Sequence, residues 1–274
     1  MPLRGAYLGT PGDMFMFAHV RGSLSSTTTR ATNYQTTLGG QLRAQVSPVA
    51  LREWQCQLPL SEPGEVARFK GLVMGLYGLG PFAWVPVDAS VTNVLTPAAS
   101  MPGPKYATWS GAGVPAGVWV IPGLGTVRHS VLATGMVLTL GQNTPVVPGL
   151  PVTGSVYIAG AGDVSVWMRT VDATGATMDN VKTVVSATQV PTRVVVSVPV
   201  VSSAAVSGHV IVSGASQVAL PAVSWTPSAA PWAPGGGSNA VFVDAFDTDL
   251  QQLNPRTCLY ENVSFTVKEL ASDA

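Results

Sequence analysis

Charged residues are scarce in this sequence. Only 10% of its 274 residues are Asp, Glu, Lys or Arg, whereas an average soluble domain carries about 25%. The 14 basic and 14 acidic residues cancel, so no net field attracts nucleic acid or an anionic membrane surface. We therefore expect no sequence-specific nucleic-acid binding. So few charges favour a surface that is covered by small polar side chains or by other protein.

Long apolar runs and cysteines are also scarce. Although 46% of the residues are hydrophobic, no segment has the ~20 uninterrupted apolar residues of a membrane helix, so we expect no membrane insertion. The N-terminus lacks a basic region followed by an apolar core, so no signal peptide is expected. The two cysteines, Cys56 and Cys258, lie far apart in the sequence. Without an export signal we expect free thiols, even if the two are neighbours in the fold.

Motifs that carry chemistry are missing as well. The three histidines, His19, His129 and His209, show no metal-ligand spacing, and the sequence has no nucleophile elbow, zinc-binding helix motif or P-loop. We therefore predict no enzyme, no catalytic residue and no cofactor. The one carboxylate cluster, Asp244, Asp247 and Asp249, is a weak candidate for Ca²⁺. Because that run lacks the glycine and final glutamate of a calcium loop, we favour a solvated loop at a domain junction.

One segment predicts a strand, a helix and a second strand. Residues alternate between apolar and polar from Trp54 to Leu60, as in a half-buried strand. Ser61 can cap a following helix, and Pro63 fits its first turn. The pattern predicts that the helix continues to Tyr77 and that Gly78, Gly80 and Pro81 end it. Its predicted apolar face consists of Val66, Phe69, Val73, Leu76 and Tyr77.

Charge is distributed unevenly along the chain. The 155 residues from Ala89 to Val243 carry eight charged side chains, and the other 119 residues carry twenty. We therefore predict a discontinuous domain of residues 1–88 plus 245–274 and an inserted β-sandwich of residues 89–244. The inserted region reads as short strands with turns every ~8–12 residues. They are Gly117 to Ile121, Val127 to Leu132, Val137 to Leu140, Val152 to Ile158, Val164 to Thr170, Lys182 to Ser186, Thr192 to Val198, His209 to Val212 and Gln217 to Leu220.

Two pairings follow from these patterns. The strands Gly154 to Ile158 and Asp163 to Met168 are expected to be neighbours, because only four small residues join them. The regular alternation from Val263 to Leu270 needs a sheet, and we expect it to pair with a strand from residues 1–88. The alternative is that this last strand closes the middle region. In the first flank, strands are expected at Met14 to Val20, Thr28 to Tyr34, Gln41 to Val46, Leu51 to Leu60 and Phe82 to Val87.

Aromatic residues gather in the charge-poor region. Trp119, Tyr157 and Trp167 are candidate glycan contacts, because an exposed aromatic ring can pack against the apolar C–H face of a sugar. Packing in the core is the alternative for each of them, and the direction in which the rings point separates the two interpretations.

Taken together, these segments resemble a known family. The strand Leu51 to Leu60, the helix Glu65 to Tyr77 and the sequence Gly80-Pro81-Phe82-Ala83-Trp84 resemble the N-terminal domain of minor tail or distal tail proteins of long-tailed bacteriophages. Val91 to Pro97 resembles the connection into the second domain of that group, which is similar to galectin or carbohydrate-binding modules. The resemblance implies a mostly β fold: a tail-tube-like sandwich or barrel with one helix, plus a jelly-roll-like sandwich.

The resemblance also implies a role in the virion. It implies a structural protein of the tail tip, assembled in the host bacterial cytoplasm as a homo-oligomeric, commonly hexameric ring. Its partners would be the tail tube protein and the hub proteins of the tip or baseplate, and the second domain would project outward. The alternative on the same particle is an adhesin that binds a host cell-surface glycan. Two further interpretations of the sequence are a secreted bacterial β-sandwich protein and an enzyme.

Overall fold

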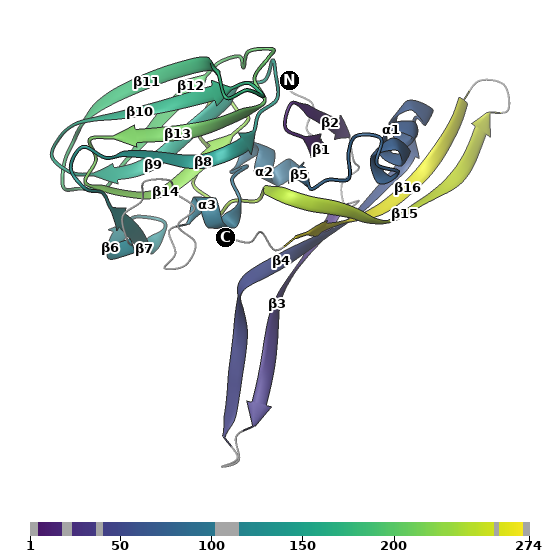
Figure 1. The fold of residues 1–274 in the computed structure, drawn as a ribbon, viewed down its shortest axis with the longest axis horizontal. Coiled ribbons are helices and arrows are strands. Elements are labelled where there is room, and N and C mark those ends of the chain that lie inside the picture. Colours follow the sequence, from purple (N-terminus) through teal and green to yellow (C-terminus); the bar gives the residue numbers. More distant parts are fainter. Residues whose placement is uncertain (1–4, 18–23, 37–40, 102–114, 255–257, 271–274) are drawn as a thin grey trace. The chain divides into compact units, whose positions relative to one another are not determined.

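The structure is a computed structural model that describes residues 5–17, 24–36, 41–101, 115–254 and 258–270. It is mostly β, as the sequence predicts (Figure 1). The chain divides into two compact units. Unit 1 comprises the described residues of Met1–Met16 and Ala83–Asn239, and unit 2 those of Phe17–Phe82 and Ala240–Asp273. Each unit is therefore assembled from segments far apart in the sequence.

Unit 1 contains an antiparallel sandwich of two sheets. One sheet has the strand order β11-β10-β13-β8, and the other has the order β12-β9-β14-β7-β6. All nine strands occur where the alternation and turn residues predict them, with ends shifted by a few residues. They are β6 (Pro115–Ile121), β7 (Gly125–Val131), β8 (Val137–Pro145), β9 (Val152–Ala159), β10 (Gly162–Val171), β11 (Thr177–Ala187), β12 (Thr192–Val198), β13 (Ser207–Ser213) and β14 (Gln217–Ser224).

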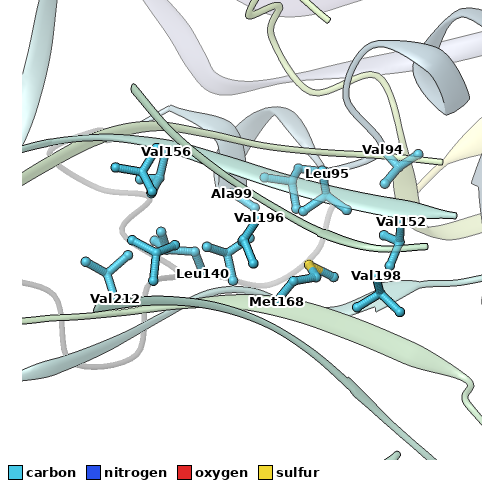
Figure 2. Close-up of a cluster of buried hydrophobic side chains, with 14 of the residues drawn as sticks. Val94, Leu95, Ala99, Leu140, Val152, Val156, Met168, Val196, Val198 and Val212 are labelled. Carbon is cyan, nitrogen blue, oxygen red and sulfur yellow. The ribbon is translucent and has the colours of Figure 1, made fainter. Parts of the chain in front are cut away.

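The main core of unit 1 lies between these two sheets. Val156 and Val196 from one sheet and Met168 and Val212 from the other belong to a single cluster of buried side chains (Figure 2). Six of the strands, β8, β9, β10, β12, β13 and β14, contribute buried residues to this cluster, so burial of β-branched side chains on a pleated surface holds the sandwich together. Val, Ile and Leu side chains of this size each contribute about 1.5–3 kcal/mol when fully buried.

One expected pairing is wrong. The strands β9 and β10 are consecutive, but β9 pairs with β12 and β14, and β10 pairs with β11 and β13. The segment Gly160–Ala161 therefore crosses from one sheet to the other instead of forming a hairpin. The burial pattern agrees with this, because β9 is buried on both faces and β10 on alternate positions only.

A short helical connection completes unit 1. The strand β1 (Ala6–Thr10) lies between β2 (Asp13–Phe17) and β5 (Phe82–Val85). The predicted strand to Val87 ends at Val85, and α2 (Val87–Val91) and α3 (Pro97–Ser100) follow, neither of which the sequence patterns predict. Thr96 caps α3 by accepting a hydrogen bond from the Ala99 N–H at 3.2 Å. These elements add Val94, Leu95 and Ala99 to the main core (Figure 2).

Unit 2 is built on four antiparallel strands in the order β15-β16-β4-β3. They are β3 (Leu24–Thr36), β4 (Leu42–Ser61), β15 (Ser238–Asn254) and β16 (Cys258–Glu269). As predicted, the last strand of the chain pairs with the first flank: Val263 lies opposite Leu58, and Val267 lies opposite Trp54. The alternation is also as predicted, because Val263, Phe265 and Val267 are buried.

The helix of unit 2, α1 (Pro63–Val73), is shorter than predicted. It ends in a Schellman motif: the Leu76 N–H donates to the Gly71 carbonyl at 2.8 Å, and the Gly75 N–H donates to the Leu72 carbonyl at 3.2 Å. Gly75 therefore ends the helix, not Gly78, and Leu76 and Tyr77 are exposed. Ser61 does not cap it, because its hydroxyl donates to the Leu58 carbonyl instead.

The buried face of α1 consists of Val66, Phe69, Gly71 and Leu72, whereas the expected Val73 is exposed. The Phe69 ring packs against Phe265 of β16, with ring centroids 4.8 Å apart. α1 is the longest helix in the described part of the chain, and none of the helices there is long and apolar enough to cross a membrane.

Candidate interaction surfaces

The three candidate glycan contacts do not form one site. Trp119 (β6) and Tyr157 (β9) belong to a small cluster of the five-stranded sheet, which is separate from the main core. Trp119 is only 7% exposed, its indole N–H donates to Gln217 Oε1 at 3.0 Å, and its ring stacks on His129 at 4.7 Å. Trp119 therefore offers no open ring face to a sugar. Trp167 lies on the four-stranded sheet and is half-buried.

His129 is part of the same packing. Its side chain is buried, and a Cβ added at Gly117 would lie 2.4 Å from its ring. Burial lowers the pKa of His129. The imidazole is therefore neutral near pH 7 and packs as a flat ring against Trp119. His19 lies outside the described residues.

The outer face of the four-stranded sheet gathers basic side chains around Trp167. Within the sheet, Trp167 lies opposite Lys182 of β11 and Ile211 of β13. Two residues further along β10, Arg169 lies opposite Asn180 and His209. Because side chains two apart on a strand share a face, Trp167, Lys182, Arg169 and His209 lie together on one face. Inward-facing neighbours such as Met168 and Val210 are fully buried, which identifies this face as the outer one.

In the part of the chain that the structure describes, no acidic side chain pairs with this basic group. Among the described residues, the side chains of Arg169, Lys182 and His209 have no hydrogen bond and no ion pair, and the buried Nε of Arg169 lacks an acceptor. The Lys182 ammonium lies 5.0 Å from the centre of the Trp167 ring, in cation–π geometry. Burial, followed by the charge of Arg169, lowers the pKa of His209. Near pH 7 the positive charge of this face therefore resides on Arg169 and Lys182.

The nearby carboxylates are engaged elsewhere in unit 1. Asp179 accepts hydrogen bonds from the hydroxyls of Thr170 and Ser202, each at 2.6 Å. Burial opposes ionisation of Asp179, but these hydrogen bonds outweigh it and lower its pKa. Asp172 closes a turn by accepting from the Thr174 and Ala176 N–H groups, and Asp163 accepts from the Ser186 hydroxyl.

The three weak metal candidates lie along β15 but do not come together. The Asp244 carboxylate accepts from the Lys268 ammonium at 2.6 Å, and this hydrogen bond lowers the pKa of Asp244. Asp247 accepts from the Thr248 N–H. A shift of register between Asp244 and Asp247 interrupts the pairing of β15 with β16. In the described part of the chain, no group of three His, Cys, Asp or Glu side chains is arranged to hold a metal ion.

Unit 2 also carries a two-stranded arm, formed by residues 28–36 of β3 and 42–52 of β4 (Figure 1). The pairing of β4 with β16 extends only from Glu53 to Ser61, and β3 is the outermost strand of unit 2. Every described side chain of residues 28–36 and 42–45 is exposed. Tyr34 is 64% exposed and Leu42 is 68% exposed. They share one face of the arm, because Tyr34 lies opposite Ala44 and Leu42 opposite Thr36.

The two cysteines are not neighbours. Cys56 lies opposite Phe265 on β16, whereas Cys258 is seven residues away from Phe265 along that strand, or about 24 Å at the rise of an extended strand. Cys56 is a buried free thiol, and burial raises its pKa to about 12. It is therefore protonated and unreactive in the folded protein.

Comparisons with known proteins give little further information. No family model matches the sequence, and no curated protein matches it. Among solved structures, the chain is similar to the enzymatically active domain of tailspike protein 4 of bacteriophage CBA120, with a TM-score of 0.37, 10% identity, and coverage of 48% of this chain and 21% of that one. It is also similar to a structure of the Gx strain of infectious bursal disease virus, with a TM-score of 0.23, 8% identity, and coverage of 98% of this chain and 56% of that one. The chain spans only a fifth of the first and just over half of the second, and at these TM-scores neither match assigns a function.

Proposed function

We propose that this chain is a structural subunit of a phage tail tip, which assembles into a ring that joins the tail tube to the tip or baseplate. The resemblance of the segments from Leu51 to Pro97 to minor and distal tail proteins suggests this role. In the proposal, unit 2 makes the contacts between subunits, and the sandwich of unit 1 serves as an outward-facing spacer or dock. The proposed partners are further copies of the chain, the tail tube protein and the hub proteins.

The observation that carries the proposal is the β3–β4 arm. A two-stranded ribbon without a third strand or a packed face is marginally stable in water, and its unpaired edges invite pairing with another chain. The described side chains of residues 28–36 and 42–45 are exposed on both faces of the arm, and the large apolar Tyr34 and Leu42 lie on one of them. A neighbouring subunit would cover this surface, and closing a ring would satisfy each arm in turn.

The low charge of the chain agrees with this role. An obligate subunit buries large lateral faces, and such interfaces are more apolar than an ordinary surface. The 10% of charged residues would serve a monomer poorly but suit a protein that is covered on several sides.

The test is the oligomeric state of the full chain and of a variant with a shortened arm. The variant joins Thr29 to Leu51 through Asn-Gly, which keeps the pairing of Thr29 with Leu51 and leaves intact the part of β4 that pairs with β16. We expect closed rings of the wild-type chain by native mass spectrometry and electron microscopy, and monomers of the variant with an unchanged circular dichroism spectrum. Met74→Ser, at an exposed site outside the arm, is the control and should still form rings. A monomeric wild-type chain that also fails to associate with tail tube protein would overturn the proposal.

Glycan binding is the second candidate function. Trp167 and Tyr157 are both half-buried, but Tyr157 packs in the small cluster with Trp119. Trp167 instead lies on a face whose basic side chains have no acidic partner among the described residues. A glycan array probed with the full-length assembly tests this function directly, and absence of binding to every sugar would leave only the assembly role.

A further inference from the structure

We infer that the outer face of the β11-β10-β13-β8 sheet binds an acidic saccharide through Trp167, Arg169 and Lys182, with a carboxylate on the pyranose ring held by Arg169. This inference rests on glycan binding, the second candidate function, and names the class of sugar and the residues that would hold it. It does not depend on ring assembly.

The first argument is the missing counter-charge. The guanidinium of Arg169 is half-buried beside His209, and its Nε is shielded from solvent without an acceptor among the described residues. Desolvating a charged donor without a partner is costly. A carboxylate bound by the guanidinium would remove that cost through charge-assisted hydrogen bonds in the bidentate geometry for which arginine is suited.

The second argument is the positive net charge of the outer face of this sheet around Trp167. Lys182 and Arg169 are the neighbours of Trp167 on this face, and among the described residues neither has an acidic partner. Arg169 lies opposite the neutral Asn180 on β11. Asp163 lies on the same face of β10 as Trp167, but it is four residues away, and its carboxylate accepts a hydrogen bond from the Ser186 hydroxyl. The local field therefore favours an anion over a cation.

The third argument is spacing. Residues two apart on a strand are about 7 Å apart. This spacing is close to the sum of the distance from the centre of a pyranose ring to its carboxylate oxygens and the length of the hydrogen bond from those oxygens to a guanidinium. A sugar whose apolar C–H face lies on the Trp167 ring would thus place its own carboxylate at Arg169. The Lys182 ammonium, on a flexible stem, can leave the indole face and contact the same acid group. A uronic acid unit meets these requirements in a single residue.

The experiment measures binding of the full chain to two oligosaccharides of equal length, one made of uronic acid units and one of the corresponding neutral sugars, by isothermal titration calorimetry. We expect the acidic oligosaccharide to bind and the neutral one to bind at least about tenfold more weakly. Arg169→Gln and Trp167→Ala should each weaken acidic binding by about tenfold or more. The matched control is Arg128→Gln, which removes the same charge from an exposed position on β7 of the other sheet and should bind as the wild type does.

The outcomes separate the two hypotheses. If neutral and acidic oligosaccharides bind equally, or if Arg169→Gln binds like Arg128→Gln, the inference is wrong while glycan binding stands. If neither sugar binds, both are wrong. The third probe is a soluble polyol phosphate. If it binds more tightly than the acidic oligosaccharide, the inferred ligand class is wrong, and the face binds phosphate rather than a sugar carboxylate. Thermal unfolding of each variant identifies any loss that comes from misfolding, and the conservative Trp167→Phe should then retain part of the affinity.

Discussion

At the scale of single residues, the buried side chain of Asn93 makes four hydrogen bonds. Its side-chain carbonyl accepts from the Leu95 N–H at 3.3 Å and the Val223 N–H at 3.1 Å, and its amide donates to the carbonyls of Pro221 and Ala233. The side chain is fully buried, and these four bonds use its whole hydrogen-bonding capacity. One amide thus ties the linker between α2 and α3 to β14 and to the loop that follows it.

We predict that Asn93→Ala destabilises unit 1 by roughly 2–4 kcal/mol, because it leaves buried backbone groups without partners. Urea unfolding followed by tryptophan fluorescence measures the change. The adjacent Thr92→Ala, which removes one exposed hydrogen bond to the Asp88 carbonyl, should cost only about 0.5–1 kcal/mol. Equal losses in the two variants would contradict this role for Asn93.

His129 predicts a dependence of stability on pH. Because burial lowers its folded-state pKa below the usual 6.5, the unfolded chain binds more protons when the pH falls through 6.5. The contribution of His129 to the free energy of unfolding of unit 1 is therefore fully present above pH 6.5 and is lost as the pH falls below this value. His209 has a lowered pKa as well and acts in the same direction.

We expect His129→Phe, which keeps a flat ring against Trp119 but cannot titrate, to reduce the loss of stability between about pH 7.5 and pH 5. Urea midpoints of the wild type and the variant at the two pH values measure this loss. The same measurement on His209→Gln gives the contribution of His209 separately from that of His129. A variant that loses as much stability as the wild type would exclude His129 as a source of the dependence.

At the scale of elements, the two ends of α1 lead to opposite predictions for two glycines, Gly64 in its first turn and Gly75 just after it. Gly75 has φ of 81° at the position after the C-cap, where any other residue is strained. Gly64 lies in the first turn, and a Cβ added there would meet nothing within 4 Å. Gly75→Ala should therefore destabilise unit 2 by about 1 kcal/mol, and Gly64→Ala should stabilise it by up to about 1 kcal/mol. Thermal unfolding of both variants gives the signs, and the same sign in both would refute this description of the helix ends.

The elements also show how far sequence patterns reach. Period-two alternation with turn residues located all nine strands of the sandwich, and the alternation at Val263, Phe265 and Val267 predicted a sheet partner for β16. The predicted end of α1 is wrong. Gly75 and Gly78 are both good helix terminators, and only the backbone hydrogen bonds donated by Gly75 and Leu76 show that the helix ends at the first of the two glycines. The partner of β9 was wrong because a short glycine-containing connection can form a hairpin or cross between sheets.

The candidate binding face was even less visible in the sequence. Trp167 could be singled out by its charge-poor surroundings, but Lys182 and His209 come to it from other strands through the register of β11 and β13. No spacing along the chain encodes that register. The absence of a partner for Arg169 among the described residues is likewise a property of the folded sheet.

At the scale of the whole molecule, the division into two units predicts two unfolding transitions. In unit 2, Glu269 holds the end of the last strand against β4: its carboxylate accepts from Arg52 Nη2 at 2.6 Å and from Arg52 Nε at 2.9 Å. This bidentate pair is mostly shielded from solvent, and the carboxylate also accepts from the Arg52 backbone N–H. Removing its negative charge leaves a shielded guanidinium with a neutral partner, which costs about 1–3 kcal/mol.

Glu269→Gln should therefore lower the transition of unit 2 and leave that of unit 1 in place, whereas Asn93→Ala should do the reverse. Cys56 provides a separate signal for unit 2, because its buried thiol, with a pKa of about 12, becomes reactive only when that unit opens. In a Cys258→Ser background, thiol labelling along a urea gradient follows unit 2. Tryptophan fluorescence reports mainly on unit 1, because three of the four buried tryptophans of the described residues, Trp84, Trp119 and Trp225, belong to it, and a Trp54→Phe substitution removes the one in unit 2. If both variants shift labelling and fluorescence together by equal amounts, the two units unfold as one cooperative body, and the segments that connect them must transmit stability as strongly as each core does.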